Sequence, residues 1–585
     1  MELQQPFRRK IRTTRCGRGI EDIVAGRWTT VALGVLGALG TGLLACSSAD
    51  PSLPGPSGGA FPDATGGASG GQVGSGGLMG SSGGTAGSPQ TSSWIEARVW
   101  RLRHEQYRNS VVALLGVEPD LTNFAPESGN GKYANFSSTA FVQVDLAANY
   151  YTAAKSISSA LPASVLTSLT SCSLGPSCKD SFIAELGERA FRSPVPSEVM
   201  ARLGALFELA SGEADAESGF RAVLAAILNS PLFLYRKELG PEDGAEEAEP
   251  TLTGYQIAEF LSFSLLDAPP PAWLLELAKN STLGEAQLES SVTRLLDESA
   301  FSEQLGHFLE EWLEVAHFSE VEKSEVFPGF AAAKPLMAQE LTTFLAQSGN
   351  AERGLRNLLL DPVPSVAPEL DDFYFSDPSA PASFERNGIL GLGSVLASHA
   401  KTYLTSPTLR GKFVRSRLFC REITLPEGFT PPPISETEAL GVAQSTRQLY
   451  EKHQESPICA TCHELTDYIG YALEAYDGAG RVRTLDTTQG FEVPIDTSGP
   501  LLESDVDRLL TDDKSLSLAL SESPTVKGCL ARQAFRYFFG LEEQAGDVPA
   551  IASGQQRLLA QDQLKELTLG LLTTPTTTRR VRGEN

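Results

Sequence analysis

The sequence predicts a mainly α-helical protein, because apolar residues recur every three to four positions while strand-like alternation is scarce. The first such segment ends at Gly116 and carries its apolar residues at Val99, Leu102, Tyr107, Val111, Leu114 and Leu115. The same spacing continues along residues 182–191, 201–209, 220–235, 252–266, 283–296, 301–315, 337–345 and 506–520. Pro269–Pro271 and Pro431–Pro433 cannot continue a helix, so we expect turns between packed helical units there.

The length of the chain predicts several domains, and its charge argues against some classes of partner. A chain of 585 residues is too long for one compact core and predicts several domains. Its net charge is −25, with acidic residues spread along the folded part. A negative surface repels phosphate groups, so we exclude nucleic acid as a partner. We also find no His-Glu-x-x-His motif and no nucleotide-binding glycine fingerprint in a strand-to-helix setting, which argues against nucleotide-dependent and metalloprotease functions.

The N-terminus has the pattern of a bacterial export signal. Its basic leader contains Arg8, Arg9, Lys10, Arg12, Arg15 and Arg18. The apolar run Val31–Ala45 follows, and it is shorter than the roughly 20 residues that a spanning helix needs. The end of this run, Leu43-Leu44-Ala45-Cys46, resembles a lipobox, in which the Cys thiol accepts a diacylglycerol. We therefore expect a signal peptide at residues 1–45 and lipidation of Cys46; the alternative is ordinary cleavage, with Cys46 a chance residue.

Residues 46–93 form a Gly/Ser-rich linker with hardly a charge, which is typical of a disordered tether. A lipid anchor followed by a tether predicts an exported cell-envelope lipoprotein, held at the membrane and facing the periplasm or the outer surface.

Motifs along the rest of the chain resemble those of a known group of exported proteins. They are Arg101–Gly116, Arg189–Pro194, Ile227–Arg236, Phe308–Leu313, Gly388–Leu396, Thr405–Gly411, Cys459–His463 and Cys529–Gly540. Together they resemble the multi-domain planctomycete and myxobacterial family of unknown function, which combines planctomycete-specific helical domains with a cytochrome-c-like module. The resemblance implies helical modules at 94–165, 166–245 and 250–350, a cytochrome-c-like module at 384–500 and a C-terminal helical module at 501–585.

One motif carries specific chemistry: Cys459-Ala460-Thr461-Cys462-His463. Cys-x-x-Cys-His is the attachment pattern of c-type haem, in which two thiols add to the haem vinyl groups and the adjacent imidazole binds the iron. Export favours this interpretation, since covalent attachment takes place outside the cytoplasm. We therefore expect one covalent haem c. The alternatives are a disulfide between Cys459 and Cys462, or a zinc site that these two thiolates form with Cys420 and Cys529.

Neither Met nor His follows His463, so either an upstream residue supplies the second axial ligand or the iron has an open position. We expect His399 to supply it, ahead of His453 and Met337; a histidine bonded to backbone is the alternative for His399. Glu474–Arg483 matches the family pattern, and there we expect Arg481 to pair with a haem propionate. Turn formation at Asp477-Gly478 is the alternative reading of that segment.

The remaining cysteines of the folded part form two pairs. Cys172 and Cys178 enclose a short Gly-Pro loop, which in an exported protein predicts a local disulfide. Cys420 and Cys529 predict a long-range disulfide between the cytochrome-c-like module and the C-terminal helices.

The leading functional hypothesis is therefore an exported lipoprotein with one c-type haem, which transfers electrons to or from an unidentified redox partner or performs haem redox chemistry. The alternative is a non-catalytic surface protein that binds an extracellular polymer, such as a polysaccharide, or a protein partner. In that case the two cysteines of the motif would form a structural disulfide.

Overall fold

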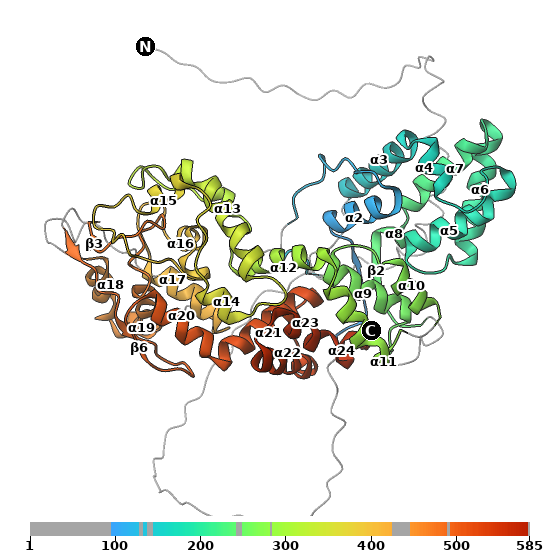
Figure 1. Cartoon of the computed structure of the whole chain (residues 1–585). Helices are drawn as coiled ribbons and strands as arrows, with labels where there is room; N and C mark the ends of the chain where they lie inside the picture. The colour runs from blue at the N-terminus through green and yellow to red at the C-terminus, as the bar shows by residue number, and fades with distance from the viewer. Residues whose placement is uncertain are drawn as a thin grey trace, which may run out of the picture. The chain divides into compact units, whose positions relative to one another are not determined.

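The computed structural model describes residues 95–127, 133–136, 144–241, 249–280, 283–423, 445–487 and 492–582. These residues are mainly helical, as the sequence predicted, and the strands are few and short (Figure 1). The expected signal peptide at 1–45, the lipidated Cys46 and the tether at 46–93 lie outside the described residues.

The first hydrophobic core is formed by helices from the N-terminal part of the described chain. Tyr107, Phe182 and Phe220 are fully buried in it, and they come from three different helices. The helices of this core are α2 (His104–Leu115), α3 (Val144–Ala160), α4 (Ala163–Ser168), α5 (Lys179–Phe191), α6 (Ser197–Glu213), α7 (Ala216–Leu228) and α8 (Pro231–Leu234). Because α5, α6 and α7 pack on one another and α3 packs on α7, these helices share one apolar interior.

A second hydrophobic core runs through most of the described residues from Leu252 onward, and Ile95, Tyr133 and Phe136 also belong to it. Its first part contains α9 (Gly254–Leu266), α10 (Ala272–Lys279), α11 (Glu285–Leu296), α12 (Ser299–Trp312), α13 (Phe330–Ser348), α14 (Leu355–Leu360) and α15 (Pro368–Tyr374). Its second part contains α16 (Gly393–Ser398), α17 (Pro407–Phe413), the π-helical turn η5 (Val414–Leu418) and α19 (Pro457–Tyr471). Helix α18 (Thr446–Gln454) packs on α19. The last helices are α20 (Asp513–Glu522), α21 (Pro524–Phe539), α22 (Val548–Gln561), α23 (Leu564–Leu572) and α24 (Pro575–Thr578).

The strands are short antiparallel pairs. The longest, β1 (Arg98–Arg101) with β2 (Tyr235–Glu238), brackets the first core. The others are β3 (Leu485–Asp486) with β4 (Val493–Pro494) and β5 (Gly499–Pro500) with β6 (Leu509–Leu510). The C-terminal segment returns to the first pair, since Ala97 N donates to Val581 O and Arg580 lies against buried Glu238. Burial opposes ionisation of Glu238, but Arg580, Arg98 and Arg236 outweigh it and lower its pKa to about 2.

Candidate functional site

The Cys-x-x-Cys-His motif lies at the start of α19. Pro457 occupies the first turn, where its missing N–H costs no hydrogen bond, and the motif follows within the next two turns. Cys459 and Cys462 are three residues apart on this helix and therefore share one face. Both are half-buried and carry free thiols, so the structure does not form the disulfide considered for this pair. Two free thiols followed by an imidazole are the donor set that covalent haem attachment requires.

Helix α17 supports the motif from one side through a close crossing with α19. A Cβ on Gly411 of α17 would overlap the carbonyl of Thr466, and a Cβ on Gly470 of α19 would overlap the carbonyl of Pro407. The two helices thus touch backbone to backbone. This crossing brings Thr408 of α17 beside the first turns of α19.

His463 is held by a buried carboxylate one turn further along α19. Its Nδ1 lies 2.8 Å from Asp467 Oδ2, and the Asp467 side chain is fully buried. Asp467 Oδ1 also accepts a hydrogen bond from Thr408 Oγ1 at 2.7 Å. The hydrogen bond to Asp467 raises the pKa of the His463 imidazole against the opposing effect of burial. Sequence reasoning missed Asp467, although side chains four residues apart face each other wherever the motif segment is helical.

The structure gives His399 a different environment from the one expected of a second axial ligand. Its Nε2 lies 3.2 Å from the Leu313 carbonyl, and its Nδ1 is 3.9 Å from a Glu314 carboxylate oxygen. Its ring stacks on Phe413 of α17 with centroids 4.1 Å apart. Burial lowers the pKa of His399 to about 4, with Glu314 and the Leu313 carbonyl opposing the shift. These contacts match the alternative named for His399, a histidine bonded to backbone.

Different residues of α17 contact the motif helix and His399. Thr408 and Gly411 lie on the face toward α19, whereas Phe413 turns toward His399. The cavity beside His399 has a volume of about 370 Å³, and six of its lining side chains are charged. They are Glu314, Lys412, Arg417, Glu422, Arg536 and Glu542.

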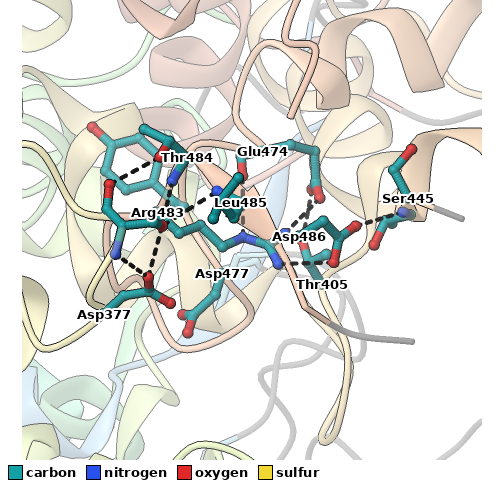
Figure 2. A network of polar contacts seen from close by, with 12 residues as sticks. Asp377, Thr405, Ser445, Glu474, Asp477, Arg483, Thr484, Leu485 and Asp486 are labelled. Atoms are coloured by element: carbon teal, nitrogen blue, oxygen red, sulfur yellow. Dashed lines mark hydrogen bonds and ion pairs between the residues drawn. The ribbon is translucent and has the colours of Figure 1, made fainter. Parts of the chain in front are cut away.

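A buried polar network connects α17 with the segment that follows the C-terminal end of α19. Glu474 accepts hydrogen bonds from Thr405 Oγ1 at 2.7 Å and from Arg410 at 3.3 Å, while its other oxygen accepts from Arg483 at 3.1 Å. Figure 2 shows the Arg483 guanidinium directed at both Glu474 and Asp486, the latter at 3.3 Å. Burial raises the pKa of Glu474, and the two arginines counter that shift.

Arg410, which also belongs to this network, binds three backbone carbonyl groups. Its guanidinium donates to the carbonyls of Leu473, Tyr476 and Asp477 at 2.8, 2.9 and 2.6 Å. These carbonyls belong to the segment that leaves α19. Arg410 therefore fixes the end of the motif helix to α17, which is a structural role.

Arg481 is engaged within a turn. Its Nε donates to Asp477 Oδ2 at 2.6 Å, and Asp477 Oδ1 accepts from the backbone N–H groups of Ala479 and Arg481. The guanidinium also lies over the Phe327 ring, 5.7 Å from its centroid. The geometry is the turn chemistry considered for Asp477-Gly478, and the charge of Arg481 already has a protein partner.

The structure contains both disulfides that the sequence predicted, Cys172–Cys178 and Cys420–Cys529. The second disulfide joins Cys420, two residues after the end of η5, to Cys529 of α21, and the two cysteines are 109 residues apart in the sequence. Because Cys420 and Cys529 are bonded to each other, the four-thiolate zinc site is wrong. Among the described residues no group of three or more His, Cys, Asp or Glu side chains is placed to hold a metal ion.

Four family models match consecutive segments of the chain. PSD3, a protein of unknown function (DUF1587), matches residues 100–162, and PSD5 (DUF1595) matches 178–238. PSD4 (DUF1592) matches 252–375, and PSCyt3 (DUF1588) matches 386–486, the segment that contains α17 and α19. All four are described as proteins of unknown function. The chain is thus a multi-domain protein built from planctomycete-type domains whose function is not established.

No curated protein and no solved structure shows significant similarity to the chain. Within the part of the chain that the structure describes, none of the helices has the length and apolar character needed to cross a bilayer.

Proposed function

We propose that this protein is an exported c-type cytochrome lipoprotein, which transfers electrons or performs haem redox chemistry at the cell envelope. One observation carries the proposal: Cys459 and Cys462 present free thiols on one face of α19, directly before a histidine whose Nδ1 is bonded to Asp467. When bound, the haem supplies a one-electron ferric–ferrous couple. The name of the PSCyt3 model, which covers the motif, also points to a cytochrome-like domain.

Different residues of this chain would attach the haem, bind its iron and anchor the helix that carries the motif. Cys459 and Cys462 would be the attachment points, and His463 would bind the iron through Nε2, because its Nδ1 is bonded to Asp467. The buried network of Arg410, Glu474 and Arg483 anchors the far end of α19. Arg481 donates Nε to Asp477, and its terminal N–H groups are the donors that we propose for a haem propionate.

A pyridine haemochrome spectrum tests the proposal directly. The full chain is matured in a host that has cytochrome c assembly machinery, denatured, and assayed for haem that stays on the polypeptide. We expect one haem per chain, and loss of the haem in the variant that carries Cys459→Ala and Cys462→Ala. The variant with Cys172→Ala and Cys178→Ala is the matched control and should keep it. A haem-free wild-type protein would overturn the proposal and favour the non-catalytic surface protein that binds a polymer or partner.

The lipid anchor is tested separately. We expect the mature protein to fractionate with membranes and to incorporate labelled palmitate, because Cys46 ends a lipobox-like run. The Cys46→Ser variant should lose the label and leave the membrane fraction. Label that persists in this variant would contradict lipidation at Cys46, while leaving the haem result unaffected.

A further inference from the structure

The contact between His463 and Asp467 differs from an ion pair on a helix surface in the burial and the hydrogen bonding of its carboxylate. The carboxylate is fully buried, and the protein fixes it from several directions. Oδ1 accepts from Thr408 Oγ1 at 2.7 Å and from Thr466 Oγ1 at 3.2 Å, while Oδ2 faces His463 Nδ1 at 2.8 Å and Gln454 Nε2 at 3.5 Å. An acceptor held in this way cannot rotate toward solvent.

The position of this acceptor depends on the crossing of α17 and α19. Thr408 comes from α17, and the backbone contact at Gly411 and Gly470 sets its distance from Asp467. A carboxylate on one helix is therefore oriented by a hydroxyl on another. The carboxylate oriented in this way faces the imidazole of the motif histidine through Oδ2.

The chemical consequence follows from the two nitrogens of a neutral imidazole. One of them carries the proton and donates, and the other accepts or binds a metal. A carboxylate at Nδ1 keeps the proton on that nitrogen, so that Nε2 carries the lone pair. A negative partner also makes the ring a stronger electron donor, as carboxylates do behind metal-bound histidines.

We propose that Asp467 is the positioning residue of the haem site: it fixes His463 as the Nδ1–H tautomer, aims Nε2 at the iron, and stabilises the ferric state over the ferrous one. The inference rests on the proposed function, because the second and third of these roles need the haem. The stronger the donation from His463, the more the iron favours its higher charge, so Asp467 lowers the reduction potential of the one-electron couple.

The first test needs no haem. Full-length apoprotein is labelled with 15N-histidine, held above the pKa of His463, and its imidazole resonances are assigned by the loss of one signal set in His463→Gln. We expect the Nδ1–H tautomer for His463 in the wild type, and a mixture of tautomers in Asp467→Asn. The Nε2–H tautomer in the wild type would overturn the inference whether or not the protein binds haem.

The second test measures the reduction potential of the matured holoprotein. Asp467→Asn keeps the shape of the side chain and removes its charge, while Glu464→Gln removes an exposed carboxylate next to His463 on the same helix and serves as the control. We expect Asp467→Asn to shift the ferric–ferrous equilibrium about tenfold toward ferrous, which is ~59 mV for one electron. The control should stay at the wild-type value.

The outcomes separate the two proposals. A protein with covalent haem in which Asp467→Asn and Glu464→Gln have the same potential overturns the inference and leaves the cytochrome in place. A wild-type protein without covalent haem overturns the proposed function and, with it, any role of Asp467 toward iron. If Asp467→Asn does not accumulate, Thr408→Val takes its place: it removes the hydroxyl that orients the carboxylate and should shift the potential in the same direction.

Discussion

Gly411 of α17 and Gly470 of α19 are the two points at which these helices approach until their backbones touch. Each glycine faces a carbonyl of the other helix, that of Thr466 or that of Pro407. Neither position requires a left-handed backbone, so it is the lack of a Cβ that matters there. The contact sets the distance between Thr408 and the His463–Asp467 pair.

Gly411→Ala or Gly470→Ala should therefore destabilise the protein. Each new methyl group meets a backbone carbonyl that cannot move independently, and overpacking of this kind costs about 1–3 kcal/mol or more. The free energy of unfolding in urea measures the effect. Gly306→Ala in α12 is the control, because a Cβ there meets no atom within 4 Å, and it should be neutral or slightly stabilising. Equal stability of Gly470→Ala and Gly306→Ala would argue against a backbone contact.

Glu474→Gln should destabilise the protein more strongly. The side chains of Arg410 and Arg483 are 1% and 6% exposed, and they would lose their shared negative partner inside the protein. Removing one partner from a buried ion pair typically costs about 3–5 kcal/mol. Urea unfolding of the apoprotein measures this loss.

The control for this variant is Glu385→Gln, which removes a carboxylate from the exposed pair Glu385–Lys514. Solvent screens that pair, so the unfolding midpoint should not change measurably. If both variants unfolded at the same urea concentration, the network around Glu474 would contribute no more than a surface ion pair.

The spacing of apolar residues was enough to predict the fold class, because most of the described helices bury residues that recur about every 3.6 positions. It failed where long-range pairing competes with it. The segment from Val99 was expected to be helical, yet Arg98–Arg101 pairs with Tyr235–Glu238 as a strand and α2 begins only at His104. Likewise, residues 506–520 were expected as one helix, but α20 begins at Asp513, since Asp512 caps it by accepting from Ser515 N.

The motif residues could be found from the sequence because their chemistry depends on neighbours in the chain. His399 could not be judged in this way, because its partner is the Leu313 carbonyl, which lies 86 residues away in the sequence. The partner of Arg481 is Asp477, four residues away within a turn, which the sequence did offer as an alternative. The environment of His463 combines a local and a long-range contact. Asp467 is four residues away on the same helix, whereas Thr408 belongs to α17 and lies beside Asp467 only in the folded protein.

The two disulfides should differ in what their removal costs. In the chain-entropy account a disulfide limits the unfolded state, and the effect grows with the closed loop. Cys172 and Cys178 are 6 residues apart and Cys420 and Cys529 are 109 apart, which corresponds to about 2 and about 5 kcal/mol. Double Cys→Ser variants, compared by urea unfolding, should follow that order. A larger loss for the Cys172/Cys178 variant would contradict the entropic account of these two bonds.

Acid should destabilise this protein through His399. The unfolded chain takes up a proton on this residue near pH 6.5, whereas the folded protein does so only near its lowered pKa of about 4, because burial disfavours the imidazolium ion. Between these values the unfolded state binds more protons, so the stabilisation is complete above pH 6.5 and is lost as the pH falls toward 4. A shift of this size corresponds to about 3 kcal/mol.

The measurement is the free energy of unfolding of the wild type and of His399→Gln from pH 7 to pH 4. Asp547 titrates in the same window with the opposite sign, since burial raises its pKa to about 6, but it is present in both proteins and cancels in the difference. The wild type should lose about 3 kcal/mol relative to His399→Gln over this range. His317→Gln, which replaces an exposed side chain, is the control and should follow the wild type. Parallel curves for the wild type and His399→Gln would mean that the imidazole at position 399 is protonated as easily in the folded protein as in the unfolded chain.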